Sequence, residues 1–182
     1  DTTKRKTFTK VTTNISNVKQ IVCGRYHTVI LKNDGSLWAC GYNDYGQLGL
    51  GTTDTNAHST FTKVTTNISN DVKQIACGYN NTFILKTDGS IWSCGYNNYG
   101  QLGLGTSGSS AYKNIFTQVT TNVSNVKEIV CGDYYTFILK NDGTVISTNI
   151  ERTSISNYGQ CDTNNWTDMV AVAAGELVTS GL

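Results

Sequence analysis

The sequence predicts an all-β fold built from repeated units of four antiparallel strands, and three observations lead to this prediction. First, the sequence of residues 18–51 is repeated at residues 72–105, with 25 of the 34 positions identical. Second, a third copy begins at Val126 and a fourth at Met169. Third, the chain is rich in Asn, Thr, Ser, Gly and Tyr, has no proline, and lacks the 3.6-residue periodicity of long helices. Such a composition is typical of strands joined by Gly and Asn turns, and fixed-period repetition indicates a repeat architecture.

Each unit contains four short segments predicted as strands, and the first copy shows them in order. Residues 18–23 form the first, and residues 27–32, which are rich in aliphatic side chains, form the second. An Asp34-Gly35 dipeptide between apolar runs predicts a hairpin turn into the third strand, residues 36–41. A Gly-rich turn and a looser connection then lead to a fourth strand around residues 61–64.

The second strand predicts how the units pack. Val29, Ile30 and Leu31 are all apolar, so both faces of this strand are expected to be buried. A small sheet with a neighbour on each face is the blade of a β-propeller. The whole chain, residues 1–182, is therefore predicted to be one propeller segment of about 3.4 repeats. The expected repeats are 18–71, 72–125, 126–168 and a partial one at 169–182, with residues 1–17 as the end of a preceding blade.

The composition argues against two classes of partner. The formal net charge is +1 and charged residues make up 15% of the chain, whereas a dedicated nucleic-acid binder usually carries a basic stripe. No apolar run approaches the ~20 residues that a membrane helix needs. We therefore expect neither nucleic-acid binding nor membrane insertion.

Six cysteines raise the possibility of disulfides or a metal site, and the repeat argues against both. Cys23, Cys77 and Cys131 occupy one position of the unit, where the fourth copy has Ala174. A position that accepts alanine is typical of a small buried side chain, and there is no Cys-x-x-Cys pair for zinc. We predict buried thiols and no metal or cofactor, with Cys161, which has no counterpart, as a candidate free thiol.

Three motifs recur in the units: Cys-Gly-x-x-His-Thr-x-x-Leu (23–31), Asp-Gly-x-x-Trp-x-x-Gly (34–41) and Asn-x-x-Gly-Gln-Leu-Gly-x-Gly (43–51). With these motifs, the units resemble the repeats of the regulator-of-chromosome-condensation family. The second copy repeats all three with Asn81 in place of histidine, and the fourth resembles the shorter bacterial version. The resemblance implies a seven-bladed propeller that acts as a binding module. With about 3.4 repeats, the chain is expected to be part of such a propeller, an oligomer that completes one, or an unusually small ring in which Phe8–Asn14 completes the blade begun at Met169.

The loops on one face of the propeller are the predicted binding site. The connections after the first and third strands emerge on the same face, and three of the nine differences between copies one and two are contiguous, at 25–27 and 79–81. A constant framework with varied loop residues can form a binding surface, and Arg and Tyr are favoured interface anchors. The alternative is neutral variation at tolerant loop positions. The predicted partner-binding residues are Arg25, Tyr26, Tyr42, Tyr45, Tyr79, Asn80, Tyr96, Tyr99, Asp133 and Tyr134.

The predicted function is a non-enzymatic protein–protein interaction module, with no catalytic residues. His27 is expected to make a hydrogen bond at the start of a strand, Trp38 and Trp92 to pack within blades, and Trp166 to lie at the surface. One alternative is a structural or carbohydrate-contacting adhesin element of a bacterial surface or phage tail protein. A second is an exchange-factor-like regulator of a small GTPase, as one eukaryotic member of the family is. Self-association through the split blade is a further possibility, and the composition loosely favours an extracellular, cell-surface or virion location.

Overall fold

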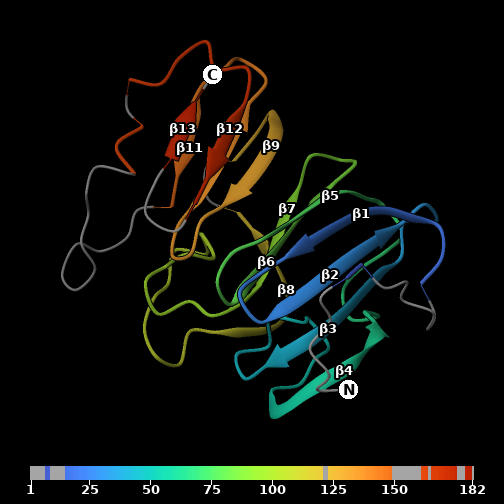
Figure 1. Cartoon of the computed structure of the whole chain (residues 1–182). Coiled ribbons are helices and arrows are strands. Elements are labelled where there is room, and N and C mark those ends of the chain that lie inside the picture. Colours follow the sequence, from blue (N-terminus) through green and yellow to red (C-terminus); the bar gives the residue numbers. More distant parts are fainter. Residues whose placement is uncertain are drawn as a thin grey trace.

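The computed structural model describes residues 7–8, 15–120, 123–148, 161–163, 165–175 and 179–181, and all regular structure in these ranges is β-strand. The strands form four antiparallel sheets that follow one another along the chain (Figure 1). We call these sheets blades 1 to 4. The prediction of an all-β chain with antiparallel four-stranded units is confirmed.

Blades 1 and 2 have the same four-stranded order. Blade 1 contains β1 (Val18–Cys23), β2 (His27–Lys32), β3 (Leu37–Asn43) and β4 (Asp54–Lys63), and each strand pairs with the next. Blade 2 contains β5 (Val72–Cys77), β6 (Asn81–Lys86), β7 (Ile91–Gly95) and β8 (Lys113–Val119). The fourth strand of blade 1 is longer than predicted, because its pairing with β3 reaches back to Asp54 opposite Asn43.

Blades 3 and 4 are shorter in the part of the chain that the structure describes. Blade 3 contains β9 (Val126–Cys131), β10 (Thr136–Lys140) and β11 (Val145–Ser147), and blade 4 contains β12 (Val172–Ala174) and β13 (Thr179–Gly181). The predicted completing strand Phe8–Asn14 lies outside the described residues except for Phe8, which is exposed. No described segment forms a helix long and apolar enough to cross a bilayer.

A repeated set of hydrogen bonds explains the Asp-Gly-Ser-x-Trp pattern. The Asp34 carboxylate accepts hydrogen bonds from the backbone N–H of Ser36 at 3.0 Å and from its hydroxyl at 2.7 Å. The Ser36 hydroxyl oxygen in turn accepts from the indole Nε1 of Trp38 at 3.1 Å. Blade 2 repeats all three bonds, and blade 3 keeps the first two with Asp142 and Thr144. The recurring aspartates are therefore turn residues, as predicted.

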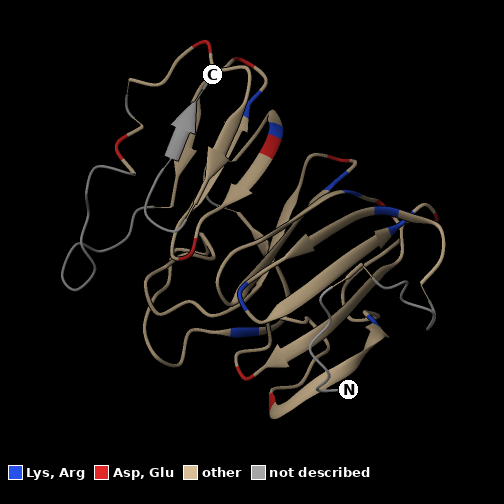
Figure 2. Ribbon diagram, in the orientation of Figure 1, with Lys and Arg blue, Asp and Glu red and all other residues tan. Residues whose placement is uncertain are grey.

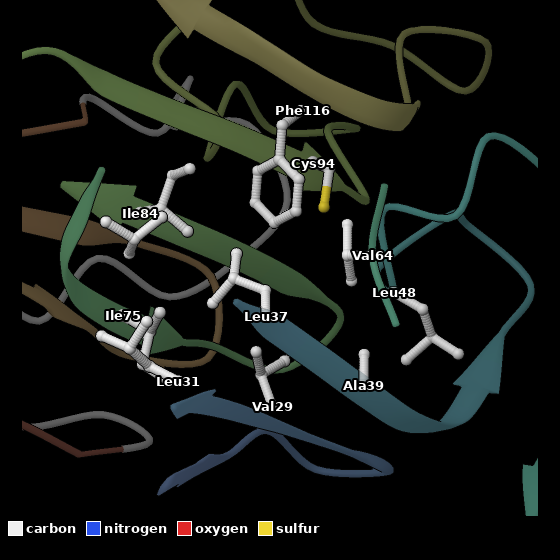
Figure 3. Close-up of a cluster of buried hydrophobic side chains, with 11 residues drawn as sticks. Val29, Leu31, Leu37, Ala39, Leu48, Val64, Ile75, Ile84, Cys94 and Phe116 are labelled. Atoms are coloured by element: carbon white, nitrogen blue, oxygen red, sulfur yellow. The ribbon is translucent and has the colours of Figure 1, made fainter. Parts of the chain in front are cut away.

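The hydrophobic cores lie between the blades. Val29, Ile30 and Leu31 are each exposed by 1% or less, which confirms that both faces of β2 are covered. Figure 3 shows Leu31 and Leu37 of blade 1 in the same cluster as Ile75 and Ile84 of blade 2. Two further clusters join blade 2 to blade 3 and blade 3 to blade 4. Each blade therefore buries its apolar side chains against its neighbours, as in other repeat proteins.

The first strand of each blade lies beside the first strand of the next. Contacts join β1 to β5, β5 to β9 and β9 to β12. The Gln20 side-chain amide bridges two of these strands, since its Nε2 donates to the carbonyl of Ile75 and its Oε1 accepts from the Ile75 N–H, both at 3.0 Å. Gln74 makes the same pair of bonds with Ile129 at 3.2 Å.

Of three predictions about single residues, one was wrong, one holds only in part and one was confirmed. Cys94 is buried, but Cys23 is exposed because the described residues place no blade over this side of β1; all six cysteines are free thiols. Trp166 is only partly exposed, since its ring packs parallel to that of Phe137 with the ring centres 6.5 Å apart and contacts the third core cluster. His27 makes its predicted bond at the start of a strand, with Nε2 3.0 Å from the Thr82 hydroxyl.

Candidate functional site

Seven tyrosines from three blades meet on one face of the molecule. They occupy the loops after the first strands and the ends or loops of the third strands, as the strand directions predicted. Their rings form an unbroken series of contacts, which we call the tyrosine cluster: Tyr42, Tyr26, Tyr79, Tyr134, Tyr99, Tyr96 and Tyr45.

The inner side of the cluster crosses from blade 1 to blade 3. Tyr42 and Tyr26 have ring centres 5.5 Å apart, and Tyr26 meets Tyr79 edge-on at 6.1 Å. Tyr79 stacks on Tyr134 at 5.3 Å with an interplanar angle of 22°. Offset stacks and edge-to-face contacts at these distances are the favoured geometries of aromatic pairs.

The outer side of the cluster returns from blade 3 to blade 1. Tyr134 meets Tyr99 at 5.8 Å, Tyr99 meets Tyr96 at 6.1 Å, and Tyr96 meets Tyr45 at 4.7 Å. The two sides border a hollow of about 330 Å³. Its walls consist of all seven tyrosines together with Asp44, Gln47 and Asn80.

Backbone hydrogen bonds between blades hold the inner loops in place. The N–H of Arg25 donates to the carbonyl of Tyr79 at 3.2 Å, and the N–H of Tyr79 donates to the carbonyl of Asp133 at 3.3 Å. Within blade 2, the N–H of Tyr96 donates to the carbonyl of Asn80 at 2.8 Å. The neighbouring Gly95 has a φ of 106° and lies so close to the Asn80 carbonyl that a Cβ would not fit there.

The outer turns are fixed by buried polar side chains. Asn43 is fully buried, and its Oδ1 accepts from the Leu48 N–H while its Nδ2 donates to the Thr52 carbonyl. The Gln47 Oε1 accepts from the Tyr45 N–H at 3.0 Å, and its Nε2 donates to Asn80 at 3.4 Å. Gln101 repeats the first of these bonds with Tyr99 at 2.9 Å. The Asn-x-x-Gly-Gln motif is therefore a scaffold that orients the tyrosines.

Arg25 and Asp133 lie at the inner rim. The Arg25 guanidinium is 4.5 Å from the ring centre of Tyr79 and 5.1 Å from that of Tyr26, and Asp133 is close enough to interact with it electrostatically. Both residues line a second hollow, of about 490 Å³, which follows the Cys-Gly ends of the first strands. The structure thus gathers eight of the ten predicted residues around one hollow and places these two beside the next.

Two tyrosines of the cluster have a raised pKa. Burial raises the pKa of Tyr96 above its ordinary value, and the neighbouring Tyr99 adds to this effect. Burial also raises the pKa of Tyr134, together with Tyr79 beside it. The cluster presents aromatic rings and hydroxyl groups, on a molecule whose charges are spread thinly over the blades (Figure 2).

The sequence analysis missed Asp44. This residue lines the hollow, and its Oδ1 is buried without a hydrogen-bond partner among the described residues. The signal was available, because the Asp44/Asn98 pair is one of the nine differences between copies one and two. The prediction considered only the three contiguous differences.

The repeats match models of a known protein family. Two sequence models described as the regulator of chromosome condensation (RCC1) repeat match the chain, one at residues 18–47 and 72–101 and the other at residues 34–85 and 88–139.

Two curated relatives illustrate the sequence similarity. A secretion-regulating guanine nucleotide exchange factor of Bos taurus is 40% identical over 87 residues, which is 48% of this chain and 18% of that protein. An X-linked retinitis pigmentosa GTPase regulator homolog of Caenorhabditis elegans is 32% identical over 131 residues, 70% of this chain and 9% of that protein. The chain thus spans less than a fifth of the length of these relatives.

Solved structures share the fold. Prp20p of Saccharomyces cerevisiae superimposes with a TM-score of 0.74 at 19% identity, over 92% of this chain and 44% of that one. Human WBSCR16 superimposes with a TM-score of 0.63 at 28% identity, over 71% of this chain and 32% of that one. The similarity to Prp20p is evidence for the fold alone, and it confirms the prediction of propeller blades.

Proposed function

Because the chain belongs to the regulator of chromosome condensation (RCC1) repeat family, we propose that it is a protein-recognition module whose partner binds at the tyrosine cluster. The observation that carries this proposal is the unbroken contact series of seven tyrosine rings across three blades. A surface assembled from separate repeats is the usual way in which repeat proteins bind their partners.

The chemistry of the cluster supports recognition of a protein. Tyr26 and Tyr42 are exposed by 49% and 44%, which is large for aromatic side chains on a folded domain. Tyrosine combines a broad apolar face with a hydroxyl group and loses little conformational entropy on binding, so it is enriched at interfaces. Ring-to-ring contacts fix these side chains in advance, which lowers the cost of ordering them.

Relatives with this fold bind other proteins. Prp20p has binding properties toward Gsp1p and histones, and it has also been crystallised bound to Kap60. A binding role without catalysis is also consistent with the recurring aspartates, Asp34, Asp88 and Asp142, whose carboxylates are engaged in hairpin turns.

Selection from a random peptide library displayed on phage tests the proposal. We expect selected peptides to lose at least about tenfold in affinity for the Tyr26→Ala and Tyr134→Ala variants, as interface anchors do. Tyr112→Ala is the matched control, since Tyr112 is 40% exposed and lies outside the cluster. Selected peptides that bind the two cluster variants as tightly as the parent chain, or a selection that yields no peptide, would contradict the proposal.

A second candidate ligand is a carbohydrate. The favouring observation is the hollow itself, where tyrosine side chains adjoin the polar side chains of Asp44, Gln47 and Asn80. A glycan array probed with the parent chain and the Tyr26→Ala variant separates the two candidates. A glycan that binds only the parent chain, together with no selected peptide, would establish the carbohydrate role.

A further inference from the structure

We infer that the hollow of the tyrosine cluster receives a basic side chain, an arginine or a lysine, of the protein partner. This inference rests on the proposed recognition role and adds to it the chemical class of the group that is bound.

The faces of the tyrosine rings are suited to a cation. An aromatic ring carries negative potential on its faces and attracts ammonium and guanidinium groups within about 6 Å of its centre. The molecule already contains this interaction, since the Arg25 guanidinium lies 4.5 Å from the centre of Tyr79 and 5.1 Å from that of Tyr26. Arg25 approaches these rings from the inner rim and is not part of the wall of the 330 Å³ hollow.

Asp44 gives the hollow a negative charge. Its Oδ1 is buried and has no hydrogen-bond donor among the described residues, which is a costly state for a carboxylate oxygen. None of the described residues in the wall is basic, and burial raises the pKa of Tyr96 and of Tyr134 in that wall. A guanidinium or ammonium group would supply both the missing N–H donor and the opposite charge.

The size of the hollow matches a single side chain. A volume of about 330 Å³ is at the lower end of the range for ligand pockets. An arginine or lysine can lay its apolar stem along the tyrosine rings while its charged end reaches the carboxylate. An acidic side chain would instead meet the Asp44 carboxylate, which is unfavourable.

Three short peptides serve as probes: acetyl-Gly-Arg-Gly-amide, its Gln counterpart and its Glu counterpart. Each is titrated into the full chain, and nuclear magnetic resonance follows the ring signals of the cluster. We expect the Arg peptide to shift the signals of Tyr45 and Tyr96 at millimolar concentration, and the Gln and Glu peptides to leave them unchanged. Asp44→Asn should weaken binding of the Arg peptide about two- to fivefold, the usual contribution of a partly exposed ion pair.

Asp88→Asn is the matched control, because it removes the same charge from an exposed hairpin and keeps the Oδ1 acceptor that its turn uses. This variant should bind the Arg peptide as the parent chain does. Equal shifts from the Gln or Glu peptide, no shift with the Arg peptide, or an unchanged affinity in Asp44→Asn would overturn the inference.

The outcome also separates this inference from the proposed function. Selected peptides can require Tyr26 and Tyr134 for binding and yet contain no Arg or Lys in their own sequences. That result would leave the recognition role in place and overturn the inference that the hollow receives a basic side chain. Binding of the Arg peptide without any selected library peptide would overturn the recognition role while showing that the hollow accepts a basic group.

Discussion

The Gln20 side-chain amide forms two hydrogen bonds with the backbone of Ile75, one as donor and one as acceptor, both 3.0 Å long. An amide can do this because it carries a donor and an acceptor side by side. The bonds join the first strands of blades 1 and 2, and Gln74 joins blades 2 and 3 in the same way. Glutamine at this position is therefore a connector between blades.

Glu128 occupies the same position on β9, and this predicts a stabilising substitution. A carboxylate can accept a hydrogen bond from the next strand but cannot donate one to its carbonyl. The repeat places Val172 of β12 where Ile75 and Ile129 stand in the earlier blades. Glu128→Gln should restore the missing donor and stabilise the chain by about 1 kcal/mol, which raises Tm by about 2–4 °C for a chain of this size.

The reverse change provides the control. Gln74→Glu removes the donor to the carbonyl of Ile129 and should lower Tm by a similar or larger amount. Thermal unfolding of the two variants and the parent chain at pH 7 measures both effects. If both variants have the same Tm as the parent chain, the glutamine bridges do not contribute to stability.

His27 predicts a loss of stability in mild acid. The side chain is 3% exposed, and burial lowers its pKa from 6.5 to about 4. The unfolded chain therefore binds more protons than the folded chain between pH 6.5 and about 4. The contribution of His27 to the free energy of unfolding is fully present above pH 6.5 and decreases as the pH falls through that window. At pH 4.5 the free energy of unfolding should be lower by about 2–3 kcal/mol.

His27→Asn isolates this effect, because blade 2 has the buried Asn81 at the same position. Urea unfolding at pH 7 and at pH 4.5 gives the free energy of unfolding for both proteins. The parent chain should lose more stability between the two pH values than the variant does. An equal loss in both would assign the acid sensitivity to other groups, such as the turn aspartates.

Much of the fold was predictable because the repeat shows each structural rule more than once. Asp34 and Asp88 both precede a glycine, and both form the predicted hairpin turn. The tyrosines of the candidate site were predictable for the same reason, since alternating strand directions place their loops on one face. Periodicity carries no information about residues outside the repeat, and it therefore did not predict that Trp166 packs against Phe137.

Trp166 is predicted to stabilise the contact between blades 3 and 4. Its ring lies parallel to Phe137 at 6.5 Å and contacts the cluster that includes Val172. Trp166→Ala should destabilise the chain by about 2–3 kcal/mol, less than a fully buried tryptophan because the side chain is partly exposed. Tyr112→Ala, at an exposed position, should change Tm very little. If Trp166→Ala melts at the same temperature as the parent chain, the Trp166 side chain does not stabilise the contact between blades 3 and 4.

The shape of the tyrosine cluster is predicted to depend on Gly95. This residue has a φ of 106°, which side chains disfavour, and a Cβ would also collide with the carbonyl of Asn80. Gly89 has a φ of 84° in the same blade, but an added Cβ would meet no atom within 4 Å. Gly89→Ala should cost about 1–2 kcal/mol from backbone strain alone, whereas Gly95→Ala should cost more.

Gly95→Ala, but not Gly89→Ala, should disturb the binding site. The Asn80 carbonyl also accepts the hydrogen bond from Tyr96, at 2.8 Å, so a shift of this carbonyl moves the Tyr96 ring away from Tyr45. Thermal unfolding gives the stability of each variant, and the ring signals of the cluster report its geometry. If Gly95→Ala alters those signals no more than Gly89→Ala does, the cluster is held by its ring contacts and not by the backbone beneath it.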